Sequence, residues 1–469
     1  MKNEKIWYEL DAFAKTYSSI ISEGRTTCFR LSALFSENID LEILQKVAIS
    51  LEKKYPFYNS ELKKGIFWNY LQQKKAHFMI EEEKTYPCTD IQKDNPLRII
   101  YFNNKLSIEI AHFLTDGKGA ALFFQDLIEE YLEKKYFLEN IEKDKTDSLI
   151  DKAEKKKEVE IEKINKIINF GKKINKNEKD FENKKSEKNF FEKTRELLGN
   201  DSVLKNSQKN EYVDLYEKYM RKVSKETTIK SAFHLPMKIL EKGQYHITTG
   251  EIDVESLKEE SKKYGTTIGK YLLSVYFKIL LDRYSQAKNP IVIGVPVDLR
   301  KIFEETTYRN FFINITPSVD ASLGAYSLSE IITYLDNYFA LKITKKEFYK
   351  SIYKAMNPMQ NIIIKSVPYL IKRMFFPFIF DYYGERGYTT GFSNLGIFKV
   401  NKKYEKYLKG LRFLPPPSKR CKIKMGVVSD CKKVYVNFGN LTANYDIERD
   451  FFVYLRKRGI KSKIITNYF

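Results

Sequence analysis

Residues 112–117 read His-Phe-Leu-Thr-Asp-Gly, and they lie where an alternating segment meets a helical one. The alternation over 105–113 predicts a strand with Leu106, Ile108, Ile110 and His112 on one face. Asp116 and Gly117 are residues that end a strand, and helical spacing of apolar residues follows over 119–136. The pattern therefore predicts His112 at the end of an apolar strand face, with a carboxylate four residues later.

A histidine in this position has two interpretations. An imidazole titrates near neutral pH, so His112 could take a proton from a hydroxyl, thiol or amine. A histidine on an apolar face can equally be a core residue whose hydrogen bonds are satisfied inside the protein. Periodicity alone leaves both interpretations open, and the residues around His112 favour the catalytic one.

Several segments resemble the coenzyme-A-dependent acyltransferase superfamily, which includes chloramphenicol acetyltransferase, peptide-synthetase condensation domains and bacterial alcohol acetyltransferases. Residues 95–132, NPLRIIYFNNKLSIEIAHFLTDGKGAALFFQDLIEEYL, resemble its HxxxDG core. Four further segments resemble the alcohol acetyltransferase branch in the same order: WYELDAFAKTYSSI with the stretch 28–71 that follows it, GVPVDLR (Gly294–Arg300), RNFFINITPSVD (Arg309–Asp320) and TTGFSNLGIF (Thr389–Phe398). The resemblance covers nearly the whole chain except residues 139–211.

The resemblance implies the fold and the domain organisation. We expect an α/β protein with mixed sheets, built as two chloramphenicol-acetyltransferase-like halves that are related by a pseudo-twofold axis, with an active-site tunnel between them. The N-terminal half is expected at 1–138 and the C-terminal half at 212–469. Residues 139–211 are dense in both signs of charge and poor in apolar side chains, so we interpret them as a low-complexity insertion.

The resemblance also implies the reaction. An acyl group, expected to be acetyl, would pass from coenzyme A to an alcohol, with His112 as general base and without an acyl-enzyme. Acyl-coenzyme A would be a co-substrate, and no permanently bound cofactor is expected. Asp116 would be structural and pair with an arginine, for which Arg300 is the first candidate and Arg30 the second. Gly117 would keep the backbone close at the turn.

Ser393 and Asn394 match the SNLG segment of the family, and one of them is expected to donate a hydrogen bond to the developing oxyanion. The alternative is a turn at a strand end that only shapes the tunnel.

Two other functions stay open at this point. Condensation domains transfer groups to or from a carrier protein, but they usually carry a doubled histidine, and Ala111 stands before His112 here. A non-enzymatic binding protein could also retain the fold. No metal site is expected, because the four histidines are scattered and form no HExxH motif.

The net charge is +21, and about 16 of these positive charges lie in residues 351–469. No nucleic-acid-binding motif accompanies them, so no nucleic-acid partner is expected. Lys419, Arg420, Lys422 and Lys424 are predicted to attract the phosphates of coenzyme A or an acidic carrier protein. Solubility alone is the alternative.

The remaining features concern the cellular setting. The four cysteines show no CxxC spacing and the N-terminus has no signal-like apolar run, so we expect reduced thiols in a cytoplasmic protein. The acceptor is expected to be a small alcohol or a lipid-like one. Residues 361–383 are the most apolar window, but lysines and prolines interrupt it. We predict a buried helix there, with a membrane-surface helix as the alternative.

Overall fold

The computed structural model describes residues 6–22, 25–89, 94–138, 212–220 and 231–467. Met1–Glu129 and Glu211–Phe469 together form one compact unit, and Glu130–Asn210 is a separate unit. The charged segment predicted at 139–211 lies outside the described residues. Apart from residues 130–138, everything described below concerns the first unit.

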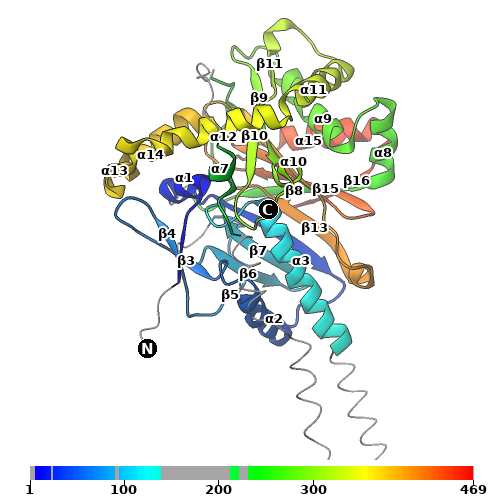
Figure 1. Ribbon diagram of the computed structural model, residues 1–469. Coiled ribbons are helices and arrows are strands. Elements are labelled where there is room, and N and C mark those ends of the chain that lie inside the picture. The colour runs from blue at the N-terminus through cyan, green and yellow to red at the C-terminus, as the bar shows by residue number, and fades with distance from the viewer. Residues whose placement is uncertain (1–5, 23–24, 90–93, 139–211, 221–230, 468–469) are drawn as a thin grey trace, which may run out of the picture. The chain divides into compact units, whose positions relative to one another are not determined.

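A five-stranded sheet holds the segment that leads to His112 (Figure 1). Its strand order is β13 (Leu408–Leu414), β2 (Cys28–Phe35), β7 (Lys105–Ala111), β6 (Leu97–Phe102) and β5 (Met79–Glu82). The pairings are antiparallel except that β5 and β6 run parallel. The helices that belong to this sheet are α2 (Leu41–Lys54) and α3 (Gly117–Glu133), which follow β2 and β7 in the chain.

The larger sheet is built from the C-terminal part of the chain. Its order is β10 (Phe312–Ile315), β9 (Ile291–Asp298), β12 (Thr390–Ile397), β14 (Ile423–Ser429), β15 (Lys433–Asn440), β8 (His246–Asp253) and β16 (Ser462–Thr466), and β11 (Ser318–Val319) also pairs with β9. A small third sheet has the order β1 (Trp7–Glu9), β4 (Tyr70–Gln73), β3 (Ser60–Lys63).

The other helices are α1 (Ala12–Ile20), α7 (Leu215–Tyr219), α8 (Val254–Lys263), α9 (Ile268–Arg283), α10 (Arg300–Phe303), α11 (Leu328–Lys342), α12 (Lys345–Gln360), α13 (Ile362–Ser366), α14 (Tyr369–Phe380) and α15 (Asp446–Arg456). Short 3₁₀ or π segments occupy Lys134–Leu138, Ala321–Leu323, Asp381–Glu385 and Lys402–Tyr407. Several helices begin where a side-chain oxygen accepts a hydrogen bond from the first turn, as Asp11 does for α1 and Thr267 for α9.

The two larger sheets repeat one topology, as the pseudo-twofold layout predicts. The path β2-β7-β6-β5 in the first sheet corresponds to β8-β15-β14-β12 in the second, with two antiparallel pairings followed by a parallel one in each. An additional antiparallel strand, β13 or β16, continues each path next to β2 or β8. Because β13 comes from the C-terminal part of the chain, a boundary at residue 212 does not separate the two sheets.

Three details differ from the sequence predictions. Strand β7 ends at Ala111, so His112 is the first residue of the following turn. The strand is buried on both faces, because Glu109 on its polar face forms ion pairs with Arg30 and Arg98. Helix α3 already begins at Gly117, because the Asp116 carboxylate accepts hydrogen bonds from the first backbone N–H groups of the helix.

The prediction of a buried helix over 361–383 is wrong in two respects, because the segment forms two helices, α13 and α14, and α14 is buried on one face only. Helix α14 buries one face against α1, but the opposite apolar face is exposed to solvent. No helix among the described residues is both long and apolar enough to cross a bilayer. All four cysteines are free thiols, and Cys431 is the exposed one.

Candidate active site

His112 is fixed by its backbone and by three aromatic rings. Its N–H donates to the carbonyl oxygen of Thr27, next to strand β2, at 2.9 Å. The imidazole stacks on Tyr17 of α1 with ring centroids 4.5 Å apart. Phe29 of β2 and Phe312 of β10 lie 5.2 and 5.3 Å from it. The half-buried His112 therefore lies in an apolar cage. The N-terminal part of the chain supplies Tyr17 and Phe29 to this cage, and the C-terminal part supplies Phe312.

Asn310 determines which nitrogen of His112 carries the proton. The Asn310 amide nitrogen donates to Asp11 Oδ2 at 3.1 Å, so its Oδ1 is the atom that faces His112 Nδ1, also at 3.1 Å. Since Oδ1 can only accept, Nδ1 of a neutral imidazole must donate. The lone pair is then on Nε2, which is the nitrogen left to accept a proton.

The apolar cage also keeps His112 neutral. Burial lowers the pKa of His112 below its ordinary value of 6.5, because desolvation disfavours the imidazolium. Asp116 and Asn310 act in the opposite direction, and the positive charge of Lys424 adds to the lowering. At neutral pH the imidazole is therefore in the form that can act as a base.

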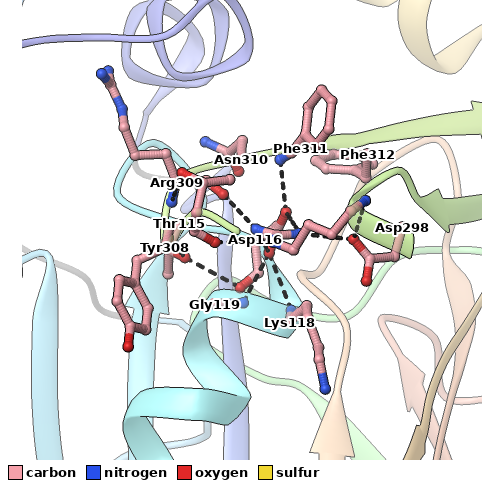
Figure 2. A network of polar contacts seen from close by, with 12 residues as sticks. Thr115, Asp116, Lys118, Gly119, Asp298, Tyr308, Arg309, Asn310, Phe311 and Phe312 are labelled. Carbon is pink, nitrogen blue, oxygen red and sulfur yellow. Dashed lines mark hydrogen bonds and ion pairs between the residues drawn. The ribbon is translucent and has the colours of Figure 1, made fainter. Parts of the chain in front are cut away.

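Asp116 is bound from three sides (Figure 2). Arg300 donates to both carboxylate oxygens, Nη1 to Oδ2 at 2.9 Å and Nη2 to Oδ1 at 3.0 Å. The backbone N–H groups of Lys118 and Gly119 donate to Oδ1, and that of Phe311 donates to Oδ2 at 2.8 Å. The carboxylate thus ties the start of α3 to α10 and to the segment that enters β10.

The pairing of Asp116 with Arg300 is the first of the two pairings that the sequence suggested. Arg300 is itself held by Asp298 at 2.8 Å and by the carbonyl oxygen of Thr307. Arg30, the second candidate, is instead bound to Glu109 and Glu83 in the first sheet.

Gly117 and Gly119 both lie at close contacts, but the two contacts differ in kind. A Cβ on Gly117 would come within 2.8 Å of the Leu395 side chain, which is flexible. A Cβ on Gly119 would come within 2.5 Å of the Tyr308 carbonyl oxygen, which belongs to the backbone. The stronger steric requirement is therefore at Gly119, whereas the sequence analysis had pointed to Gly117.

Ser393 and Asn394 are in β12. The residue that follows them in the same strand, Leu395, has its side chain next to Gly117. The Asn394 side chain is exposed, and its Oδ1 accepts a hydrogen bond from the N–H of Gly396. Neither side chain forms a hydrogen bond with His112 in the described part of the chain. The oxyanion role suggested for them stays a prediction.

The four cationic residues after Pro417 lie in different surroundings, and their predicted attraction of phosphates stays a prediction. Lys422 donates from Nζ to the carbonyl oxygens of Leu235 and Met237, so it holds two backbone segments together. Lys424 is the cation whose charge reaches His112. Lys419 is exposed to solvent.

Sequence reasoning missed Asp11, Tyr17 and Asn310 as members of the site. Asp11 was detectable as an Asp before the helical run that begins at Ala12. Asn310 lies inside the quoted segment RNFFINITPSVD, but no local signal brings it to His112, which is 198 residues away. Within the described residues, no cluster of three or more His, Cys, Asp or Glu side chains could hold a metal ion.

No family model matches the sequence, and no curated protein matches it. Solved structures do match. TRI101 of Fusarium sporotrichioides, solved with coenzyme A and T-2, is 10% identical with a TM-score of 0.57, over 98% of this chain and 99% of that one. The trichothecene 15-O-acetyltransferase TRI3 of the same organism is 10% identical with a TM-score of 0.52, over 95% and 94%.

The starter condensation domain of rhizomide synthetase, solved with C8-CoA, is 11% identical with a TM-score of 0.52, over 96% of this chain and 94% of that one. At these identities the similarity establishes the fold only. The chain has the two-domain fold shared by coenzyme-A-dependent acyltransferases and condensation domains, as the sequence resemblance implied.

Proposed function

We propose that this protein transfers an acyl group from acyl-coenzyme A to the hydroxyl group of an alcohol. The observation that carries the proposal is His112, a neutral imidazole whose Nδ1 is engaged by Asn310 and whose Nε2 is left to take a proton. Two structures of the same fold contain coenzyme A or C8-CoA, which supports the choice of donor.

In the proposed reaction, Nε2 of His112 removes the proton of the acceptor hydroxyl as its oxygen attacks the thioester carbonyl. The tetrahedral intermediate collapses, the C–S bond breaks, and the coenzyme A thiolate takes the proton back from the imidazolium. No acyl-enzyme forms. Ser393 or Asn394 would donate a hydrogen bond to the oxyanion, and Lys424 would add positive potential.

Asp116, Arg300 and Gly117 would support the site and not react. The Asp116–Arg300 pair fixes the turn after His112. The aromatic cage around His112 suits an apolar chain beside the reacting hydroxyl, which supports a lipid-like alcohol as acceptor. Acetyl is the acyl group that the family resemblance implies. Donor and acceptor would enter a tunnel between an N-terminal half (1–138) and a C-terminal half (212–469), in a cytoplasmic protein.

The test is a panel of acyl-coenzyme A donors and alcohols with the purified protein. Released thiol reports transfer, and mass spectrometry identifies the ester. His112→Ala should lower turnover by about 10²- to 10⁴-fold while leaving the protein folded, because it removes the base.

The matched control is His77→Ala, since His77 is an exposed histidine that pairs with Glu52. It should leave turnover unchanged. Acyl transfer that needs a carrier protein would favour a condensation-type function, and ligand binding without any thiol release would favour a binding protein. Normal turnover of His112→Ala would remove His112 from the mechanism.

A further inference from the structure

The outer face of α14 is a continuous apolar surface. Leu370, Met374 and Phe378 are 71%, 67% and 74% exposed and recur every four residues along the helix. Ile66, at the tip of the turn between β3 and β4, is 77% exposed. We call this set the α14 surface, and its exposed apolar members are Ile66, Phe67, Ile362, Leu370, Ile371, Met374, Phe375, Phe378, Ile379 and Tyr382.

The opposite face of α14 is firmly packed, so the exposure is not the result of a detached helix. Phe376 packs edge-on against Trp68 with ring centroids 5.7 Å apart. Tyr369 accepts a hydrogen bond from the Asn69 amide at 2.8 Å. Lys372 Nζ donates to the carbonyl oxygen of Phe67 at 3.0 Å and lies 3.8 Å from the Trp68 ring centroid. These contacts hold the β3–β4 turn and α14 together as one surface (Figure 1).

Along residues 361–380 the charges have one sign, and the carboxylates near the α14 surface are those of Glu9, Asp214 and Glu217, which line one pocket with Phe67 and Lys365. Residues 361–380 contain two lysines and one arginine and no Asp or Glu. Lys64, Lys365 and Arg373 are exposed, and none of them pairs with a carboxylate within the described ranges. The first carboxylate after α14, Asp381, is neutralised by Arg25 at 2.5 Å. Three exposed cations that form no ion pair among the described residues, Lys64, Lys365 and Arg373, therefore lie within or beside the elements that carry the apolar surface.

We propose that the α14 surface docks on an anionic lipid bilayer. An amphipathic helix with an apolar face and basic borders lies in the plane of the membrane interface, with its apolar side chains below the headgroups and its cations near the phosphates. A second copy of the chain is the poorer occupant, because a symmetric contact would bring the same cations together.

The packed face of α14, opposite the α14 surface, is connected to His112 by aromatic side chains. Phe380, the last residue of α14, lies 6.4 Å from the Tyr17 ring, which in turn stacks on His112. Resting on the proposed function, docking through α14 would bring His112 within two packed rings of the helix that meets the bilayer, and this points to an amphiphilic alcohol as acceptor. The membrane would then present the acceptor, while acyl-coenzyme A arrives from the aqueous side.

Co-sedimentation with vesicles tests docking without any substrate. The full-length protein should bind vesicles of phosphatidylcholine and phosphatidylserine, and bind more weakly to phosphatidylcholine alone or at high salt. The triple variant Leu370→Ser, Phe375→Ser, Phe378→Ser should lower the partition coefficient by about tenfold or more, because it removes apolar area that enters the interface. The double variant Lys365→Glu, Arg373→Glu should lose the preference for phosphatidylserine.

Matched controls use exposed residues that lie outside the α14 surface. Leu323→Ser with Leu341→Ser removes two leucines that are 77% and 72% exposed, and Lys301→Glu with Lys346→Glu reverses two exposed cations. Both controls should bind vesicles like the wild type. Size-exclusion chromatography should show that the wild type and the triple variant have the same oligomeric state.

Kinetics separate this inference from the proposed function. With a short water-soluble alcohol and no vesicles, the triple variant should turn over like the wild type. With a long-chain alcohol in phosphatidylserine vesicles, the turnover of the triple variant should fall about tenfold or more, in proportion to its loss of vesicle binding. No wild-type binding to anionic vesicles, undiminished binding by the triple variant, or a dimer that the triple variant disrupts would each overturn the docking proposal. Absence of transfer to any alcohol would instead overturn the proposed function.

Discussion

At the scale of single residues, Asn310 holds His112 in the tautomer that the proposed proton transfer needs, without touching a reacting atom. One end of its amide is held by Asp11 and the other faces His112 Nδ1, both at 3.1 Å. Burial raises the pKa of Asp11, although the nearby Arg309 guanidinium acts in the opposite direction. As long as Asp11 is ionised it can only accept, so the amide orientation and the imidazole tautomer are fixed together.

Replacing Asn310 should change the pH profile of the reaction. In the wild type, kcat/KM should fall as pH drops through the lowered pKa of His112, that is, below 6.5. Asn310→Asp places a carboxylate beside the imidazole, so this acid limb should move to higher pH by about one unit or more. Asn310→Ala should lower kcat by about tenfold or more with little change in the donor KM, because the ring loses its orientation. An unchanged acid limb in Asn310→Asp would show that Asn310 does not set the state of His112.

The two glycines of the turn after His112 should respond differently to alanine. Gly119→Ala should destabilise the protein by about 2 kcal/mol, because its Cβ meets the Tyr308 backbone carbonyl. Gly117→Ala should cost less than about 1 kcal/mol, since the Leu395 side chain can move away. Urea unfolding of both variants gives the comparison. Equal losses of stability in Gly117→Ala and Gly119→Ala would contradict the steric difference between the two positions.

At the scale of secondary-structure elements, Asp116 joins three of them at one point. Its carboxylate accepts from the first turn of α3, from Arg300 of α10 and from the Phe311 N–H that precedes β10. The Asn310–Phe312 segment, which supplies both the amide and one aromatic wall of the His112 cage, is therefore held in register with His112 by this carboxylate.

Asp116→Asn should cost both stability and activity. The buried Arg300 guanidinium would lose an ionised partner, at a cost of about 3 kcal/mol, the lower end of the usual range because Asp298 still pairs with it. The melting temperature and the turnover number should both fall in Asp116→Asn. Asp298→Asn is the control: its side chain is 28% exposed, and its loss should have a smaller effect. A variant with lost turnover but the wild-type melting temperature would favour a direct catalytic role for Asp116.

At the scale of the whole molecule, the first sheet is completed by a strand from the far end of the chain. Strand β13 pairs with β2 over Leu408–Leu414, so the five-stranded sheet forms only once both parts of the chain are present. The contacts of Asp116 with Arg300 and Phe311 join the same two parts. The N-terminal and C-terminal strands should therefore unfold together in one cooperative transition.

The charged segment should be dispensable for this unit. Replacing residues 143–208 with a short Gly/Ser linker should preserve the thermal transition and turnover, because the segment has too few apolar side chains to offset its ordering entropy. Limited proteolysis of the full chain should cut there before it cuts elsewhere. Loss of expression, or of the thermal transition, in the shortened chain would show that the segment contributes to folding.

The sequence by itself determined the strand, the turn and the helix around His112. Strand β7 and helix α3 match the alternating and helical segments on either side of the turn within a few residues. These features are local, because side-chain periodicity and turn residues act over a few neighbours. Family resemblance added Arg300 as the partner of Asp116.

Only the tertiary structure decided three features: the partner of His112 Nδ1, the pairing of β13 with β2 in the first sheet, and the exposure of α14. Asn310 and His112 are far apart in the sequence, and their contact depends on how β10 and β7 are placed by the folded chain. An apolar run looks the same whether a neighbouring element covers it or not, so the run over 361–383 predicted a buried helix. Whether an apolar face is buried depends on what packs against it, and on α14 the described protein covers only the face that meets α1 and Trp68.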